Sequence, residues 1–183
     1  LTGATAALAG PAPKSRGGFK HEPMIFFVAR GDADACGPGC DTWIGAEGTF
    51  DPEAPKRLAE FMAVPGRQRL PVYFHSPGGS VRPSYIIARL LRGRKAVARI
   101  GRTIATACTG GTQVDAACLK IKTAGGEIQA QLTTRNAMCN SACGYVFLGA
   151  TTREVAPDAA IAVHDSRVML MVRGQPTARQ DGT

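Results

Sequence analysis

Short apolar runs alternate along this chain with segments that carry an apolar stripe at helical spacing, and this alternation constrains the fold most. Runs rich in β-branched and aromatic residues predict strands at residues 24–29, 42–48, 70–74, 96–107, 128–132 and 160–164. Helices are expected after Asp51, Ser80 and Ser141, because each is a favoured N-cap residue ahead of an apolar stripe or run. Strand and helix in succession favour an α/β fold with a largely parallel sheet.

The second expected helix begins at Ser80 and ends in a cluster of cations. We expect its buried side to consist of Tyr85, Ile86, Leu90 and Leu91. The cluster contains Arg89, Arg92, Arg94 and Lys95. Cations at this end complement the helix dipole. The alternative is a patch that meets an anionic surface of the cell envelope.

The length of 183 residues fits one domain with a tail. We expect a leader or linker over 1–22, a folded domain over 23–173, and a tail over 174–183 with no packing element. Ala7-Leu8-Ala9 resembles a signal-peptide cleavage site. No stretch is long enough to span a membrane. Whether the domain is truncated at its C-terminus is left open.

Six cysteines fall in close couples and predict disulfides. The couples are Cys36 with Cys40, Cys108 with Cys118, and Cys139 with Cys143. An even number in local clusters suits an oxidising compartment, hence a periplasmic or secreted protein. Zinc-site spacing is lacking, so we expect no metal site, and no cofactor motif stands out. Six cysteines allow about 15 pairings, so the connectivity stays open; Cys139 and Cys143 could pair with each other or with Cys108 or Cys118.

The net charge of +8 favours an acidic partner. Aromatic residues make up only 6% of the chain, and they do not alternate with basic residues. Both observations argue against nucleic-acid binding.

A serine with small neighbours opens the third expected helix and is a candidate nucleophile. Ser141 would lie where unpaired helix N–H groups favour developing negative charge. His164 follows a strand 23 residues later (164 − 141) and is the natural general base. Gly78 and Gly79 lack side chains, so their N–H groups could face a bound carbonyl, and the Ala142 N–H would be a second donor.

Each of these residues also has a plainer interpretation. Ser141 could only cap its helix, and His164 could be structural. Cys139 or Cys143 could act as nucleophile, but a disulfide removes the thiolate that this chemistry needs. His75 is the competing base; we interpret it as a residue that orders the glycine loop. His21 lies in the expected linker.

Three motifs in this order resemble a known family. They are His75-Ser-Pro-Gly-Gly-Ser-Val81, the small-Ser141-Ala142 helix start, and Val163-His164 after a strand. Together they resemble the Clp-protease-like serine peptidases of the crotonase-type fold. Cys36-Gly-Pro-Gly-Cys40, Trp43-Ile-Gly-Ala-Glu-Gly48 and Cys139-Asn-Ser-Ala-Cys143 look closest to predicted periplasmic Clp-protease-like proteins of proteobacteria.

The resemblance covers residues 24–165 and implies a ClpP/crotonase-like fold of repeated strand-strand-helix units. It implies Ser141 as nucleophile, His164 as base, and an oxyanion hole of Gly79 and Ala142 with Gly78 shaping the turn. In the family an Asp orients the base and lies well after the His. Asp165 is adjacent to His164 and would point to the opposite face of a strand; Asp158 and Asp181 have no motif to support them.

We therefore expect a serine-type hydrolase that acts on a peptide or protein. The main alternative is a catalytically silent binding module of the cell envelope; a thiol-redox protein and an acyl-CoA enzyme are further alternatives. The family's oligomerisation segment follows the His, so ring assembly does not carry over, and a homo-oligomer is left open.

Overall fold

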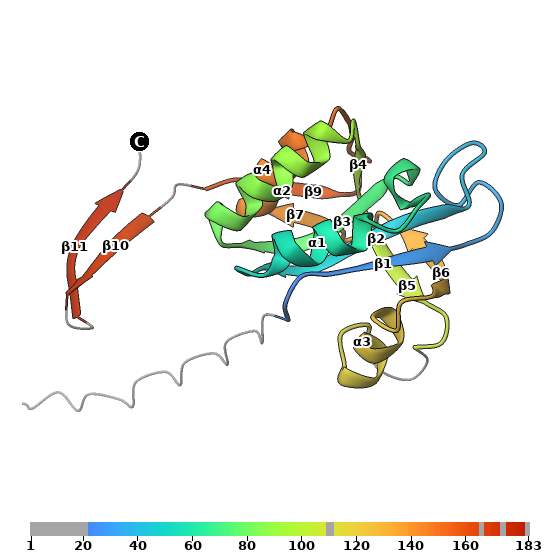
Figure 1. Cartoon of the computed structure of the whole chain (residues 1–183), viewed down its shortest axis with the longest axis horizontal. Helices are drawn as coiled ribbons and strands as arrows, with labels where there is room; N and C mark the ends of the chain where they lie inside the picture. The colour runs from blue at the N-terminus through green and yellow to red at the C-terminus, as the bar shows by residue number, and fades with distance from the viewer. Residues whose placement is uncertain (1–21, 109–111, 165–166, 173–174, 182–183) are drawn as a thin grey trace, which may run out of the picture.

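The computed structural model describes residues 22–108, 112–164, 167–172 and 175–181, with side chains up to 164. These residues form a mixed α/β fold with a nine-stranded sheet, a separate two-stranded sheet and four α-helices (Figure 1). The expected α/β class is therefore confirmed.

The main sheet contains the strands β1 (Ile25–Arg30), β2 (Thr42–Phe50), β3 (Val72–Gly79), β4 (Val97–Ile100), β5 (Arg102–Ala105), β6 (Glu127–Thr133), β7 (Met138–Asn140), β8 (Thr152–Glu154) and β9 (Ala160–Ala162). The helices are α1 (Ala54–Met62), the short 3-10 helix η1 (Arg67–Arg69), α2 (Val81–Gly93), α3 (Ala116–Lys122) and α4 (Ala142–Gly149).

The strand order is β5-β6-β1-β2-β3-β4-β8, and β7 pairs with both β3 and β9. The β1·β2 and β5·β6 pairs are antiparallel, and the other pairs of this sheet are parallel. The expectation of a largely parallel sheet is confirmed.

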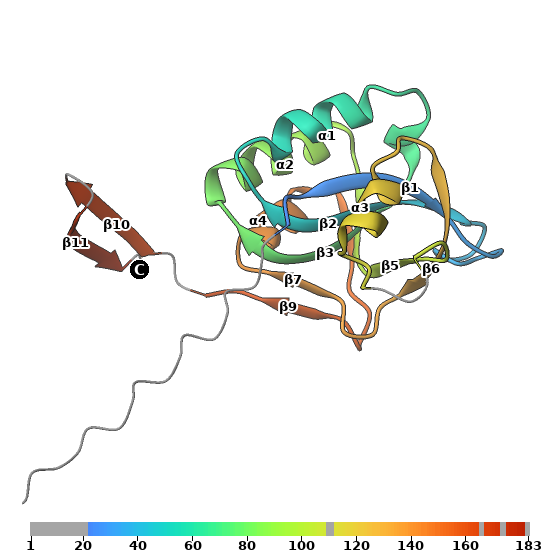
Figure 2. The same cartoon turned by 90° about the horizontal axis from the view of Figure 1, so that it is seen from below.

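Both faces of the sheet are covered. Helices α1, α2 and α4 lie on one face, and α3 lies apart from them near β5 and β6 (Figures 1 and 2). Neighbouring residues of one strand therefore enter different cores: Phe74 packs in the core under α1, α2 and α4, while Tyr73 packs with Trp43 in the second core. This burial explains why the strands read as nearly continuous apolar runs.

Residues 96–107 were expected to form one strand but form two. The chain bends at Gly101, between β4 and β5. A Cβ at Gly101 would lie 2.6 Å from the Tyr73 ring, so a larger residue does not fit. β4 pairs with β3, near one edge of the sheet, and β5 pairs with β6, at the opposite edge. The bend therefore allows consecutive strands to join opposite ends of the strand order.

The expected buried side of α2 is partly wrong. Its buried residues are Pro83, Ser84, Ile87 and Leu91, at helical spacing. Tyr85 and Ile86 remain 47% and 42% exposed. Ser84 is polar and yet fully buried, so the apolar pattern alone predicted the wrong side of the helix.

Several further elements were not expected from the sequence: η1, α3, β7, β8, β10 (Arg167–Val172) and β11 (Gln175–Asp181). Helix α3 falls at the end of the Gly/Thr-rich stretch and is capped by the Asp115 side chain, which accepts from Cys118 N at 2.9 Å. At the C-terminal end, β10 and β11 form an antiparallel pair. Part of the expected tail is therefore paired strand. Of the expected leader over 1–22, residues 1–21, which include His21, lie outside the described residues.

Candidate active site

Ser141 lies at a sharp strand-to-helix turn between β7 and α4. Its backbone has φ 53° and ψ −121°, a combination that residues with a side chain rarely adopt. Ser80, which precedes α2, has the ordinary extended N-cap values of φ −73° and ψ 133°. The Ser141 side chain makes no capping hydrogen bond to α4. A capping role therefore does not explain why a serine occupies the position before α4.

The backbone of Ser141 is held on both sides. Its N–H donates to Ala162 O at 2.7 Å, and its C=O accepts from Gly144 N at 2.9 Å. Gly78 lies directly against it, because a Cβ at Gly78 would be 2.7 Å from Ser141 Cβ and 3.4 Å from Ala142 N. No side chain other than hydrogen fits at Gly78, where φ is 111°.

Ser141 and His164 line the same hollow of about 240 Å³, together with Gly79. Strands β7 and β9 run in parallel with Asn140 opposite Ala162. Ser141 follows the end of β7, and His164 lies two residues beyond the end of β9, so the pairing brings them to one edge. The structure thus brings together three of the predicted catalytic and oxyanion-hole residues. Ala142 is buried at the first position of α4.

Gly78 and Gly79 are the last two residues of β3, and the register between β2 and β3 shifts just before them. Gly78 N donates to Ser76 Oγ at 3.1 Å, and Ser76 Oγ donates to Gly48 O at 2.6 Å. The N–H of Gly78 is therefore used within the loop. Gly79, with φ 139°, lines the hollow itself.

His75 lies on β3 and acts as a hydrogen-bond acceptor. Its Nδ1 accepts from Met138 N at 3.2 Å, at the start of β7. Burial, with the positive charges of Arg102 and Lys122, lowers the pKa of His75 from 6.5 to about 4. A neutral His75 thus anchors the strand that leads to Ser141, and it does not line the Ser141 hollow.

The three close couples of cysteines are all disulfides: Cys36–Cys40, Cys108–Cys118 and Cys139–Cys143. The prediction of disulfides is confirmed. Cys139 and Cys143 stand on either side of Ser141 and are fully buried. Three disulfides are typical of proteins in an oxidising, non-cytoplasmic compartment.

The apolar wall of the hollow was not predicted. Gly144, Tyr145 and Leu148 line it from α4, and Val81 and Val163 line it from outside that helix. Positions three, four and seven residues after Ser141 share one helix face. Counting helical positions from Ser141 would therefore have predicted that Gly144, Tyr145 and Leu148 lie beside the serine.

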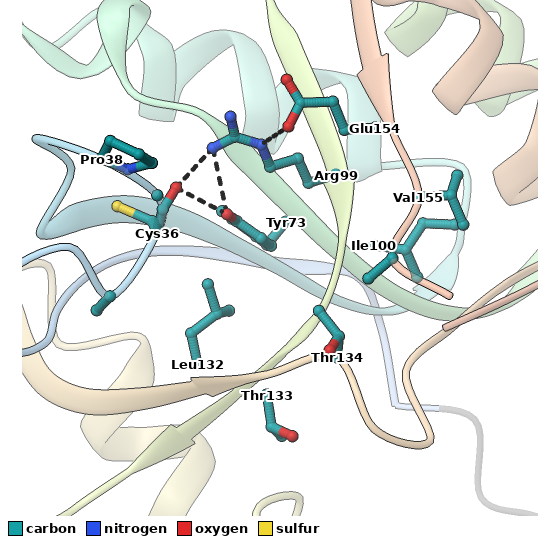
Figure 3. A pocket seen from close by; sticks show the side chains of 13 residues that line it. Cys36, Pro38, Tyr73, Arg99, Ile100, Leu132, Thr133, Thr134, Glu154 and Val155 are labelled. Carbon is teal, nitrogen blue, oxygen red and sulfur yellow. Dashed lines mark hydrogen bonds and ion pairs between the residues drawn. The ribbon is translucent and has the colours of Figure 1, made fainter. Parts of the chain in front are cut away.

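A larger hollow of about 570 Å³ does not contain Ser141 (Figure 3). On its floor, Arg99 donates to Cys36 O at 2.7 Å and to Glu154 Oε2 at 2.7 Å. The Tyr73 hydroxyl donates to Cys36 O at 3.1 Å, and burial raises the pKa of Tyr73. These contacts fix the Cys36–Cys40 loop on the sheet, and we assign this hollow no catalytic role.

A buried ion pair was also missed. Lys122 Nζ lies 2.6 Å from Glu47 Oε2, and their side chains are 0% and 9% exposed. Glu47 Oε1 also accepts from Thr103 N at 2.9 Å. This network ties α3 to β2 and β5. The sequence around Lys122 does not indicate that a distant acidic residue pairs with it.

Two cations of the cluster at the end of α2 bind helix carbonyls. Arg92 donates to Leu148 O at 3.1 Å near the end of α4, and Arg94 donates to Met62 O at 3.0 Å at the end of α1. Cations commonly satisfy the last carbonyls of a helix. These contacts favour a structural role for the two arginines, and the anionic-surface interpretation stays a hypothesis.

The orienting acid of a triad is not assigned. Asp158 lies before β9, whereas His164 lies beyond its other end, and Asp165 falls outside the described residues. Within the described residues, no three His, Cys, Asp or Glu side chains gather in a way that could hold a metal ion. Over the same ranges, no helix is long and apolar enough to cross a bilayer.

Comparisons with protein-family models, with curated proteins and with solved structures found no match to this chain. The resemblance to Clp-protease-like peptidases therefore rests on the motifs, and the ClpP/crotonase fold stays a prediction. The site has to be judged by its own geometry.

Proposed function

We propose that the chain is a serine-type hydrolase of the periplasm or a similar oxidising compartment, with a ClpP/crotonase-like fold and a peptide or protein substrate. The observation that carries the proposal is the backbone of Ser141. Disfavoured φ/ψ values persist where the surrounding structure enforces them, and they cluster at active sites. A serine held in this way between a strand and a helix presents its hydroxyl to the adjoining hollow.

His164 would act as the general base. It takes the Ser141 Oγ proton as Oγ attacks the substrate carbonyl, and it then gives the proton to the leaving amine. Water hydrolyses the resulting acyl-enzyme by the same route. The sharing of one hollow by Ser141 and His164 supports these roles.

The N–H groups of Gly79 and Ala142 would hold the oxyanion. Ser80 N donates to Phe50 O at 2.7 Å, on the β2 side of the chain. Because consecutive N–H groups of a strand point to opposite edges, we expect the Gly79 N–H to face β7 and Ser141. Ala142 is the first residue of α4, where a helix provides no acceptor for the N–H. Two such donors stabilise a developing negative charge.

The apolar wall suits the side chain of a peptide substrate. Val81, Tyr145, Leu148 and Val163 are apolar or aromatic residues that line it together with Ser141. We therefore expect an apolar residue on the acyl side of the cleaved bond.

Labelling with a fluorophosphonate tests the proposal. Wild type should be labelled at Ser141, as identified by peptide mass spectrometry, and Ser141→Ala should not be labelled. Ser80→Ala is the matched control, since Ser80 also precedes a helix without a capping bond. Labelling of Ser141→Ala at the wild-type rate would refute the assignment.

The second candidate is a silent binding module that uses the same hollow. The observation in its favour is the exposed apolar surface there: Leu148 is 59% exposed and Val163 is 81% exposed. This candidate predicts no labelling of wild type, and peptide binding that Ser141→Ala leaves unchanged.

A further inference from the structure

The Cys139–Cys143 disulfide spans the turn that contains Ser141. Cys139 lies in β7, and Cys143 lies in the first turn of α4. Their Cα atoms are 5.1 Å apart. In an extended chain, residues four apart would be separated by about 13 Å, far beyond the reach of a disulfide. The bond therefore requires the chain to turn sharply between the two cysteines, where Ser141 lies.

The backbone of Ser141 needs such a constraint. A residue with φ 53° and ψ −121° relaxes to ordinary values unless its neighbours prevent this. The hydrogen bonds of its N–H and C=O hold two peptide groups. The disulfide adds a covalent link across the whole turn, and it is the part of this arrangement that depends on oxidation.

We propose that the Cys139–Cys143 disulfide positions Ser141, so that the serine reaches its full nucleophilic reactivity only after the two thiols are oxidised. This inference rests on the proposed function. In the oxidation, the two thiols lose two protons and two electrons to an external disulfide, which is reduced to two thiols. Both cysteines are 0% exposed, so the step belongs to folding and is not a reversible switch in the folded protein.

The chain contains a matched control. Cys36–Cys40 has the same sequence separation of 4, and its Cα atoms are 5.0 Å apart. Cys36 lines the larger hollow, away from the Ser141 hollow. Loops of equal length should contribute similarly to stability. Replacing either pair by alanine should thus lower the free energy of unfolding by a similar amount. Only the replacement of Cys139 and Cys143 should lower the reactivity of Ser141.

The test compares Cys139→Ala/Cys143→Ala with Cys36→Ala/Cys40→Ala in the full chain. For each, the rate constant of fluorophosphonate labelling per folded molecule and the urea unfolding midpoint are measured. We expect labelling to fall roughly 10- to 100-fold in the first variant, because the disfavoured turn is less populated. We expect a change of at most about twofold in the control. A purely structural role would shift the midpoint and leave the rate per folded molecule unchanged.

Two failures are distinguishable. If wild type is labelled and the Cys139→Ala/Cys143→Ala variant is labelled at the same rate, the positioning role is overturned and the proposed function stands. If wild type is not labelled, the proposed function fails, and a crystal structure of that variant decides the positioning role. A Ser141 φ near +53° in the variant overturns it, and a return to negative φ supports it.

Discussion

His75 is a histidine that its surroundings keep neutral. Its Nδ1 must be unprotonated to accept the Met138 N–H. Its pKa of about 4 in the folded protein lies below the ordinary value of 6.5. As the pH falls, the unfolded chain therefore takes up this proton first. The stability that neutral His75 contributes is complete above about pH 6.5 and is lost as the pH falls towards 4.

Replacing His75 by Asn should flatten this pH dependence. The Asn side-chain oxygen can replace Nδ1 as the acceptor, but it does not titrate in this range. Between pH 6.5 and 4, the free energy of unfolding of wild type should fall by about 3 kcal/mol more than that of His75→Asn. Urea denaturation across this range measures the difference. Identical pH dependence in the two proteins would contradict the assigned cause of acid sensitivity.

At the residue scale, the sequence was most informative where a residue type has a narrow chemical use. A serine among small residues, a histidine after a strand and a pair of glycines were predicted, and Ser141, His164 and Gly79 line one hollow. The sequence did not predict the backbone angles of Ser141. Those angles depend on β9 and Gly78, which are distant in the chain.

At the element scale, the main strands and the helices α1, α2 and α4 were predicted better than the contacts between them. The bend at Gly101 depends on the position of Tyr73, and the buried side of α2 depends on the position of α4. The local sequence pattern contains no information about either position. Helix α3 was missed for the same reason, because its buried Lys122 needs Glu47 from β2.

Removing the charge of Lys122 should destabilise the protein strongly. Lys122→Met leaves the Glu47 carboxylate buried without its partner, so we expect a loss of roughly 3–5 kcal/mol in the free energy of unfolding. The double variant Glu47→Gln/Lys122→Met should recover part of the loss, since Gln can still accept from Thr103 N.

The exposed ion pair of Arg30 with Glu127 is the control for this prediction. Arg30→Met should cost much less than Lys122→Met, because water screens exposed charges. Urea denaturation of the four proteins gives the comparison. A Lys122→Met variant as stable as Arg30→Met would show that the buried pair does not hold α3.

At the scale of the whole molecule, the disulfides connect stability with compartment. In the chain-entropy account, the two short loops contribute about 2 kcal/mol each and the Cys108–Cys118 loop about 3 kcal/mol. Their sum of about 7 kcal/mol is comparable with the whole stability of an ordinary domain. The chain should therefore be stable only where its thiols are oxidised.

Unfolding in the presence of a reductant tests this dependence. With all six described cysteines reduced, as counted by thiol titration in denaturant, the chain should fail to refold at 37 °C, because little net stability remains. The oxidised chain should refold from urea under the same conditions, and circular dichroism distinguishes the two. If the reduced chain refolds with an unchanged thermal midpoint, the stability of the fold does not depend on its disulfides. The disulfides would then no longer be an argument that the protein works in an oxidising compartment.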